Sequence, residues 1–251
     1  MIPYLGCKQS FASEILANIP AADNFYDLFG GGGSVIEAAH RCRENGLFGE
    51  WVKWKYLHYN EINKGVCRLC RALWAGRFDF KFAKAQEPTK ERYYEERRKP
   101  TAWGAFVSMI WSFGNRDESF IYASKSNVMR HNEHLQRIKR MEKSPILPDV
   151  EMYCKDYRDV KIACNSVVYC DIPYQVKNNH CKTKIKFNHL DFYEWAASRK
   201  FPVYFSEYDC FDKRFQLIWN KCVPAKINRK YINNKTLYKI EKLFWNGVKN
   251  G

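Results

Sequence analysis

Short apolar runs that stop at polar or glycine positions recur along the chain and predict buried strands. Residues 24–29 (Asn-Phe-Tyr-Asp-Leu-Phe) lead into four glycines, and residues 56–60 and 166–170 have the same apolar character. Apolar positions from Val35 to about Arg43 instead have the helical period. Strand, glycine turn and helix in this order are typical of the nucleotide-binding end of a doubly wound α/β sheet.

The glycine turn at residues 30–33 is the first candidate for a binding site. Glycine lets the backbone adopt positive φ and pass close to a ligand, and the start of the following helix offers free N–H groups. A flexible loop is the alternative, because a glycine run alone carries little information. Val35 and Ile36 occupy the places where a dinucleotide motif needs its third glycine, and no Gly-Lys-Ser/Thr follows. We therefore expect a ligand without a pyrophosphate or triphosphate.

An acidic residue follows the second predicted strand. Glu61 comes directly after residues 56–60. An acid at the carboxyl end of this strand is well placed to accept hydrogen bonds from both ribose hydroxyls of a nucleoside. The two strand ends together predict a nucleoside ligand that carries no phosphate.

A third strand end carries the candidate chemistry. The apolar run at residues 166–170 stops at Asp171-Ile172-Pro173-Tyr174. Asp171 supplies an acceptor-only carboxylate, Pro173 excludes helix at Ile172, and Tyr174 adds an aromatic face. This set suits a flat heterocycle with an exocyclic amine. An ordinary strand-ending turn, in which Asp and Pro are common, is an equally good interpretation of these four residues alone.

The charge of the chain indicates a polyanionic partner. Among 251 residues, 42 Lys plus Arg face 27 Asp plus Glu, so the net charge is +15. With 46% hydrophobic and 16% aromatic residues, the chain is not a disordered basic tail. Residues 81–143 carry a net +6 and residues 182–251 a net +9, whereas residues 1–80 (+1) and 144–181 (−1) are nearly neutral. Nucleic acid and an anionic membrane surface both remain open at this point.

Other classes are disfavoured by simple patterns. No apolar run approaches the roughly 20 residues that a membrane-spanning helix needs, and residues 1–8 lack the pattern of a signal peptide. Ten cysteines are spread singly, which predicts a reduced intracellular protein. Cys67 and Cys70 form a C-x-x-C that we interpret as two buried or half-buried helix residues, because no second pair stands at zinc spacing.

Together these stretches resemble the Dam-type DNA adenine-N6 methyltransferases, in which the cofactor motifs precede a D-P-P-Y motif. The resemblance covers most of the chain and keeps the family's order. It rests on the motif-like stretches at residues 3–8, 29–35, 59–63, 106–115, 154–157, 168–174 and 202–209. The most specific of these is Val168-Tyr169-Cys170-Asp171-Ile172-Pro173-Tyr174, similar to V-Y-x-D-P-P-Y.

The resemblance implies a fold and a cofactor. The fold is a Rossmann-like α/β methyltransferase sheet, formed by residues 1–80 and 148–251, with an inserted and mainly helical target-recognition region at residues 81–147. The cofactor is S-adenosylmethionine. The residues that the resemblance assigns to it are Tyr4, Lys8, Asp27, Phe29, Gly31, Gly33, Ser34, Glu61, Asp156 and Tyr157.

The resemblance also implies a reaction. The Asp171 carboxylate and the Ile172 carbonyl accept hydrogen bonds from adenine N6, Pro173 shapes the turn, and Tyr174 stacks on the base. The adenine is flipped out of duplex DNA, and the chemistry needs no metal. The candidate DNA contacts are Asn115, Arg116, Arg130, Arg137, Lys139, Arg140, Lys184 and Lys186. The basic residues between Lys90 and Lys99 alternate with acidic residues. A solvent-exposed helix face therefore explains much of the charge of that segment without DNA contacts.

Three departures from the family pattern keep alternatives open. Cys7 replaces a glycine of the opening motif, Ile172 replaces the first proline of D-P-P-Y, and Trp111-Ser112 stand where an arginine and an aromatic residue are usual. The alternatives are a DNA-binding homologue with impaired catalysis, and a methyltransferase acting on an RNA base or a protein glutamine. We expect a cytoplasmic enzyme of a bacterial or phage-infected cell, with double-stranded DNA as its partner, no membrane association, and a plausible monomeric state.

Overall fold

The computed structural model describes residues 2–4, 6–44, 53–112, 120, 128–175, 187–224 and 238–250. Within these residues one sheet has the strand order β3-β2-β1-β4-β5-β7-β6. The strands are β1 (Ala22–Asp27), β2 (Trp54–Asn60), β3 (Glu151–Tyr153), β4 (Ser166–Cys170), β5 (Val203–Glu207), β6 (Gln216–Pro224) and β7 (Tyr238–Trp245). β1 to β5 pair in parallel, and β7 pairs antiparallel with both β5 and β6.

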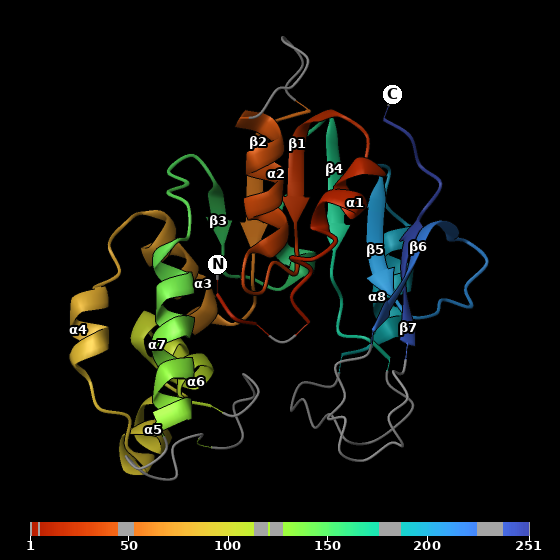
Figure 1. Cartoon of the computed structure of the whole chain (residues 1–251). Coiled ribbons are helices and arrows are strands. Elements are labelled where there is room, and N and C mark those ends of the chain that lie inside the picture. Colours follow the sequence, from red (N-terminus) through yellow and green to blue (C-terminus); the bar gives the residue numbers. More distant parts are fainter. Residues whose placement is uncertain are drawn as a thin grey trace.

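Helices cover both faces of this sheet (Figure 1). They are α1 (Ala12–Ala17), α2 (Ser34–Glu44), α3 (Lys64–Trp74), α4 (Phe80–Ala85), α5 (Lys90–Glu96), α6 (Ala102–Ile110), α7 (Val128–Glu142) and α8 (His189–Ala197), with a short 3₁₀ turn at Tyr157–Asp159. The predicted strands and the helix after the glycines are confirmed within two residues. The predicted α/β fold class is also confirmed.

The burial of the central strands explains why they have no polar alternation. All five residues of β4 and all five of β5 are buried. Neighbouring residues go to opposite faces: Val167 joins the core formed with α1, α2 and α3, whereas Val168 joins the core formed with α8. A parallel sheet covered on both faces needs continuous apolar runs.

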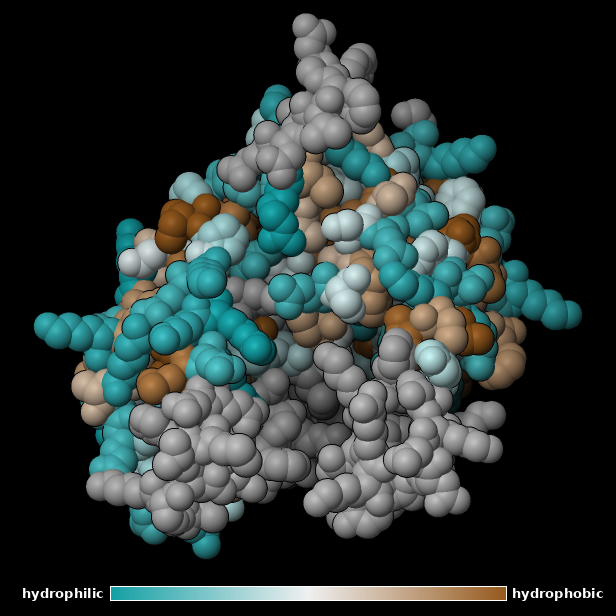
Figure 2. Space-filling model, in the orientation of Figure 1, coloured by the Kyte–Doolittle hydropathy of each residue, from teal (hydrophilic) through white to brown (hydrophobic). Residues whose placement is uncertain are grey.

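The segment expected to form the target-recognition region is helical where it is described. Helices α4 to α7 gather beyond the β3 edge of the sheet (Figure 1), and α6 packs on α3. Figure 2 shows many hydrophilic side chains over this part of the molecule. The boundaries at residues 81 and 147 stay a prediction.

One cysteine pair contradicts the expectation of reduced thiols. Cys67 in α3 and Cys154 after β3 form a disulfide, with their Cα atoms 6.1 Å apart. The residues are 87 positions apart in the sequence, so spacing gave no sign of the pairing; only the packing of α3 beside β3 brings them together. Cys67 and Cys70 are fully buried in a helix, as expected.

Among the described residues, no helix is long and apolar enough to cross a membrane.

Candidate active site

The predicted acids meet at one edge of the sheet. β1 lies between β2 and β4, and Asp27 is in register with Tyr59 of β2 and Tyr169 of β4. Asp27, Glu61 and Asp171 therefore all lie at the carboxyl ends of adjacent parallel strands. The strand order reverses beside β1, and ligands of doubly wound sheets bind at such a switch point.

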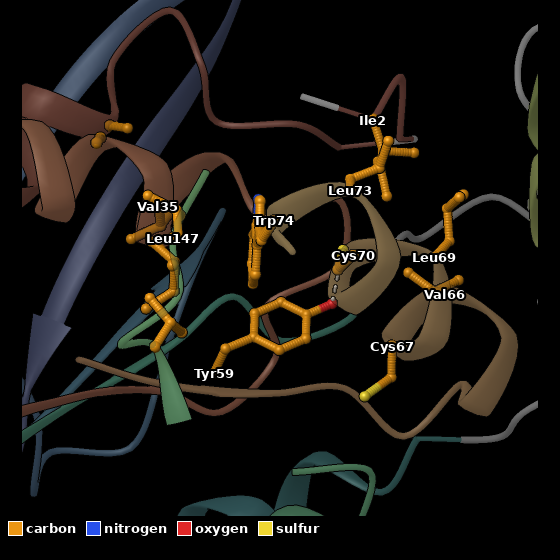
Figure 3. Packing of buried hydrophobic residues seen from close by; sticks show 14 of the residues in the cluster. Ile2, Val35, Tyr59, Val66, Cys67, Leu69, Cys70, Leu73, Trp74 and Leu147 are labelled. Carbon is orange, nitrogen blue, oxygen red and sulfur yellow. Dashed lines mark hydrogen bonds between the residues drawn. The ribbon is translucent and has the colours of Figure 1, made fainter. Parts of the chain in front are cut away.

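The glycine turn is fixed from β2. Gly31 and Gly33 have φ of +49° and +82°, which a residue with a Cβ rarely adopts. The Gly31 N–H donates to Glu61 Oε2 (3.0 Å), and the Tyr59 hydroxyl donates to the Gly31 carbonyl (2.6 Å). The Tyr59 ring also packs edge-on against Trp74 of α3, and its hydroxyl faces Cys70 (Figure 3). The turn is thus a rigid part of the core rather than a flexible loop.

Part of the need for glycine comes from the protein itself. A Cβ on Gly30 would lie 2.2 Å from the Tyr59 ring, and a Cβ on Gly31 would lie 3.0 Å from the Tyr4 ring. The sequence led us to expect close approach to a ligand. In the structure, aromatic side chains already make that close approach on one side of the turn.

Glu61 is a buried carboxylate with spare acceptor capacity. Its two oxygens accept the N–H groups of Gly31 (3.0 Å) and Asn63 (2.8 Å). Burial raises the pKa of Glu61, and these two donors partly oppose the shift. Each carboxylate oxygen has a second lone pair, so Glu61 can order the glycine turn and still accept hydroxyl groups.

Asp27 carries an unpaired polar atom. Its side chain is buried, and Oδ1 has no hydrogen-bond partner among the described residues. Burial raises the pKa of Asp27 well above its usual value, with smaller contributions from Asp171 and Glu61. A buried acceptor without a donor costs free energy unless a ligand supplies one. Asp27 Oδ1 is therefore an acceptor to which a ligand could donate a hydrogen bond.

The Asp171 carboxylate is paired with Lys8. Lys8 Nζ lies 2.6 Å from Asp171 Oδ1 and 4.6 Å from the centre of the Tyr174 ring, and it donates to the Gly6 carbonyl (3.2 Å). Burial raises the pKa of Asp171, while the ammonium of Lys8 opposes the rise. Lys8 is itself held in place because its backbone N–H donates to Ser34 Oγ (3.3 Å).

Tyr174 is held by the antiparallel strand β7. Its hydroxyl donates to Glu241 Oε2 (2.7 Å), and the buried Glu241 pairs with Lys239 through its other oxygen (2.7 Å). The Tyr174 and Tyr208 rings form an edge-to-face pair whose centroids lie 4.5 Å apart. These contacts thus hold an aromatic face, that of Tyr174, beside the Asp171 carboxylate.

The D12 class N6 adenine-specific DNA methyltransferase family model matches residues 4–206. The chain belongs to this family. The enzyme class expected from the sequence, an adenine-specific DNA methyltransferase, is therefore confirmed. No curated protein matches the chain. The family match ends before β6 and β7, so the Glu241–Lys239 pair behind Tyr174 lies outside it.

The turn at Asp171 in this methyltransferase has a structural support that the sequence did not predict. His189 Nε2, at the start of α8, lies 2.8 Å from the Pro173 carbonyl and 3.5 Å from Glu207 Oε2. The fully buried Glu207 accepts the N–H of Gln175 (3.0 Å). The hydrogen bond to Glu207 raises the pKa of His189. Glu207 lies in the motif-like stretch at residues 202–209, but no local pattern in the sequence marks its contact with His189.

Tyr157 and Asp156, which the resemblance assigns to the cofactor, differ in how available they are to a ligand. Tyr157 is buried, and the centroid of its ring lies 5.1 Å from that of Phe29, so these two aromatic residues are in contact. The Asp156 carboxylate, however, accepts the Arg158 backbone N–H (3.0 Å) and its guanidinium (2.8 Å). Arg158 lowers the pKa of Asp156. A ligand amine therefore has to share this carboxylate with Arg158.

The predicted DNA contacts divide into four groups. Lys139 and Arg140 are exposed on α7, whereas Arg137 is half-buried and donates to the Ser112 carbonyl (3.2 Å). Arg130 lies in α7 without a described side chain. Outside the described residues lie Asn115, Arg116, Lys184 and Lys186.

The structure also explains a basic residue of the Lys90–Lys99 segment and one departure from the family pattern. Lys99 pairs with Glu95 (3.1 Å) and Glu96 (2.7 Å) on the surface of α5 and the turn after it, which supports the solvated-face interpretation of that segment. Trp111 is fully buried against Trp103, so this departure from the family pattern serves the core. Across the described part of the chain, no group of three or more His, Cys, Asp or Glu side chains could hold a metal ion.

Proposed function

We propose that this enzyme transfers the methyl group of S-adenosylmethionine to N6 of a specific adenine in duplex DNA. The proposal rests on one observation above all: the Asp171 carboxylate lies at the same sheet edge as the glycine turn and Glu61. A methyl donor and an amine acceptor bound at neighbouring strand ends would meet there.

The residues present suit the cofactor. Glu61 has lone pairs for ribose hydroxyls, the unpaired Asp27 Oδ1 needs a donor, and Phe29 with Tyr157 offers an apolar site for a purine. Bound S-adenosylmethionine would supply an electrophilic methyl group. The chain's own residues would do the remaining work of holding and orienting the acceptor.

Asp171 and Ile172 would activate the acceptor. The lone pair of adenine N6 is delocalised into the ring, which makes this nitrogen a poor nucleophile. Hydrogen bonds from N6–H to the Asp171 carboxylate and the Ile172 carbonyl localise the pair and stabilise the positive charge that develops on nitrogen. Such preorganised electrostatic stabilisation is commonly a large part of catalysis. Ile172 needs only its carbonyl for this role, so the missing proline leaves the chemistry intact.

The acceptor adenine must leave the duplex to reach Asp171. Flipping costs about a few kcal/mol. Stacking on Tyr174 would offset part of it, at roughly 1–3 kcal/mol per stacked base. The Glu241 and Tyr208 contacts would hold the Tyr174 ring ready for that base. Exposed basic side chains such as those of Lys139 and Arg140 would contact the phosphates of the DNA.

The test is methyl transfer from labelled S-adenosylmethionine to duplex DNA by the purified protein. We expect wild-type transfer, and a loss on the order of 100-fold or more for Asp171→Ala. Asp149→Ala is the matched control, because Asp149 is an exposed carboxylate paired with Arg43 away from this edge. Transfer by Asp171→Ala at the wild-type rate would contradict the assignment. Transfer to RNA or protein but not to DNA would favour the alternative substrates.

A further inference from the structure

We propose that the disulfide between Cys67 and Cys154 is a reversible redox-modification site that controls the affinity of the enzyme for its cofactor. In the oxidised form the disulfide holds two walls of the cofactor pocket together, and a dithiol reductant releases them. The inference rests on the proposed function, because it concerns the pocket assigned to S-adenosylmethionine. It adds an effect on binding to the effect that a cross-link has on stability.

The first wall is formed by residues 61–67. The Glu61 carboxylate, which we assign to the ribose, accepts the Asn63 N–H through Oε1 (2.8 Å). The Asn63 side chain caps α3, because its Oδ1 accepts the N–H groups of Gly65 (3.0 Å) and Val66 (3.3 Å). Cys67 lies in the first turn of this helix, and its N–H donates to the Asn63 carbonyl (2.9 Å). The position of Cys67 is therefore coupled to that of Glu61 through Asn63.

The second wall is formed by residues 154–157, directly after β3. It includes Asp156 and Tyr157, which the family resemblance assigns to the cofactor. The strand β3 has only three residues and lies at the edge of the sheet, so few strand-to-strand hydrogen bonds hold this segment. Asn60 exchanges two hydrogen bonds with the backbone of Lys155 (both 3.1 Å). A covalent bond from α3 to Cys154 further limits how far this segment can move away from the Glu61 side.

The disulfide lies where the two walls meet. The Glu61 N–H donates to the Tyr153 carbonyl (3.3 Å), and the Cys67 sulfur lies 3.3 Å from the same oxygen. The residue after Tyr153 is Cys154, the other half of the disulfide. A pocket that is ordered before binding spares the ligand the free energy of ordering it. The oxidised pocket therefore binds the cofactor more tightly than the reduced pocket.

Burial and hydrogen bonding suit a reversible reaction. Cys67 of α3 (Figure 3) is fully buried and Cys154 is half-buried, so a thiolate of the dithiol attacks the Cys154 sulfur. The S–S bond breaks, and the Cys67 sulfur leaves with the bonding electron pair and takes up a proton. The second thiol of the reductant then displaces Cys154 as a thiol and closes the reductant's own disulfide. The protein gains two electrons and two protons, and the Tyr153 carbonyl accepts the new Cys67 S–H.

The test compares cofactor binding by the oxidised and the reduced protein. Equilibrium dialysis with labelled S-adenosylmethionine gives the Kd before and after treatment with dithiothreitol, and alkylation with peptide mapping identifies the cysteines that reduction frees. We expect the Kd to rise about tenfold on reduction, the size expected when one or two side chains must be ordered on binding. Cys154→Ser should bind like reduced wild type and should not respond to dithiothreitol. Cys164→Ser is the matched control, because it changes an exposed free cysteine in the loop before β4.

A linked measurement on wild type completes the test, and Cys154→Ala replaces Cys154→Ser if the latter does not fold. Because binding and reduction are linked reciprocally, saturating S-adenosylmethionine should lower the ratio of reduced to oxidised protein about tenfold in a dithiothreitol redox buffer. Equal Kd values for the two forms, both folded by circular dichroism, or a redox ratio that the cofactor leaves unchanged, would overturn the proposal. Methyl transfer by the oxidised protein separates this failure from failure of the proposed function. Binding of the cofactor to neither form would overturn both.

Discussion

Asp27 shows how a single buried carboxyl links stability to binding. Its Oδ1 is unpaired among the described residues, and burial raises its pKa. A raised pKa in the folded state destabilises the fold as pH rises above the unfolded value near 3.9. Asp27→Asn should therefore raise the free energy of unfolding by about 1–3 kcal/mol at pH 8, and leave it nearly unchanged at pH 4.

Urea unfolding at the two pH values measures this effect on stability. Calorimetry measures the affinity for the cofactor. The same Asp27→Asn protein should bind S-adenosylmethionine less tightly than wild type. A variant with equal stability at pH 8 would show that Asp27 is satisfied in the protein without the cofactor.

At the scale of elements, the turn after β4 is supported by α8 and β5. The hydrogen bond to Glu207 raises the pKa of His189. A base whose pKa is raised on folding adds stability below its unfolded pKa, near 6.5, and this stability is lost as pH rises through the folded value. His189→Ala should therefore destabilise the enzyme more at pH 6 than at pH 9 in urea unfolding.

The His189 variants also test whether this contact positions the turn. His189→Ala should lower kcat about tenfold or less while leaving the KM for the cofactor close to that of wild type, and His189→Gln should recover part of the loss by keeping a donor for the Pro173 carbonyl. Equal destabilisation at both pH values would mean that His189 is not charged in the folded protein.

The disulfide between α3 and the segment after β3 is the second link between elements. It closes a loop of 87 residues, and cross-links of this kind stabilise by about 2–4 kcal/mol. Cys67→Ser should lower the free energy of unfolding by that amount under oxidising conditions. Cys42→Ser, which changes an exposed free cysteine, is the control. Equal stability of both variants and wild type would exclude the cross-link in solution.

The elements that the sequence predicted are those whose signals are local. β1, β4 and the turn at Asp171 stand out because apolar runs end at glycine or acidic residues. The Lys8–Asp171 pair, the His189 contact and the Cys67–Cys154 disulfide join positions far apart in the chain. No local pattern marks such contacts, because they exist only once the sheet has assembled. Trp111 is a similar case, since burial rather than sequence context explains it.

Over the whole molecule, the positive charge is concentrated in two segments of the sequence. The net charge is +15, and residues 81–143 and 182–251 account for all of this excess. Phosphate contacts release counterions, so the affinity for DNA should fall about 10³- to 10⁵-fold between 50 and 200 mM salt if six to ten phosphates are bound. Cofactor affinity should barely change. Fluorescence anisotropy with duplex DNA and calorimetry with S-adenosylmethionine measure the two; a parallel loss of both would contradict this division of charge.

We propose above all that Asp171 is required for methyl transfer to adenine N6 in DNA. Mass spectrometry of nucleosides from the DNA of cells that lack their own adenine methylation tests it most directly. Cells expressing wild type should contain N6-methyldeoxyadenosine, and cells expressing Asp171→Ala at the same level should contain only the background amount. Absence of the modified nucleoside with wild type, or equal amounts with both proteins, would contradict this role of Asp171.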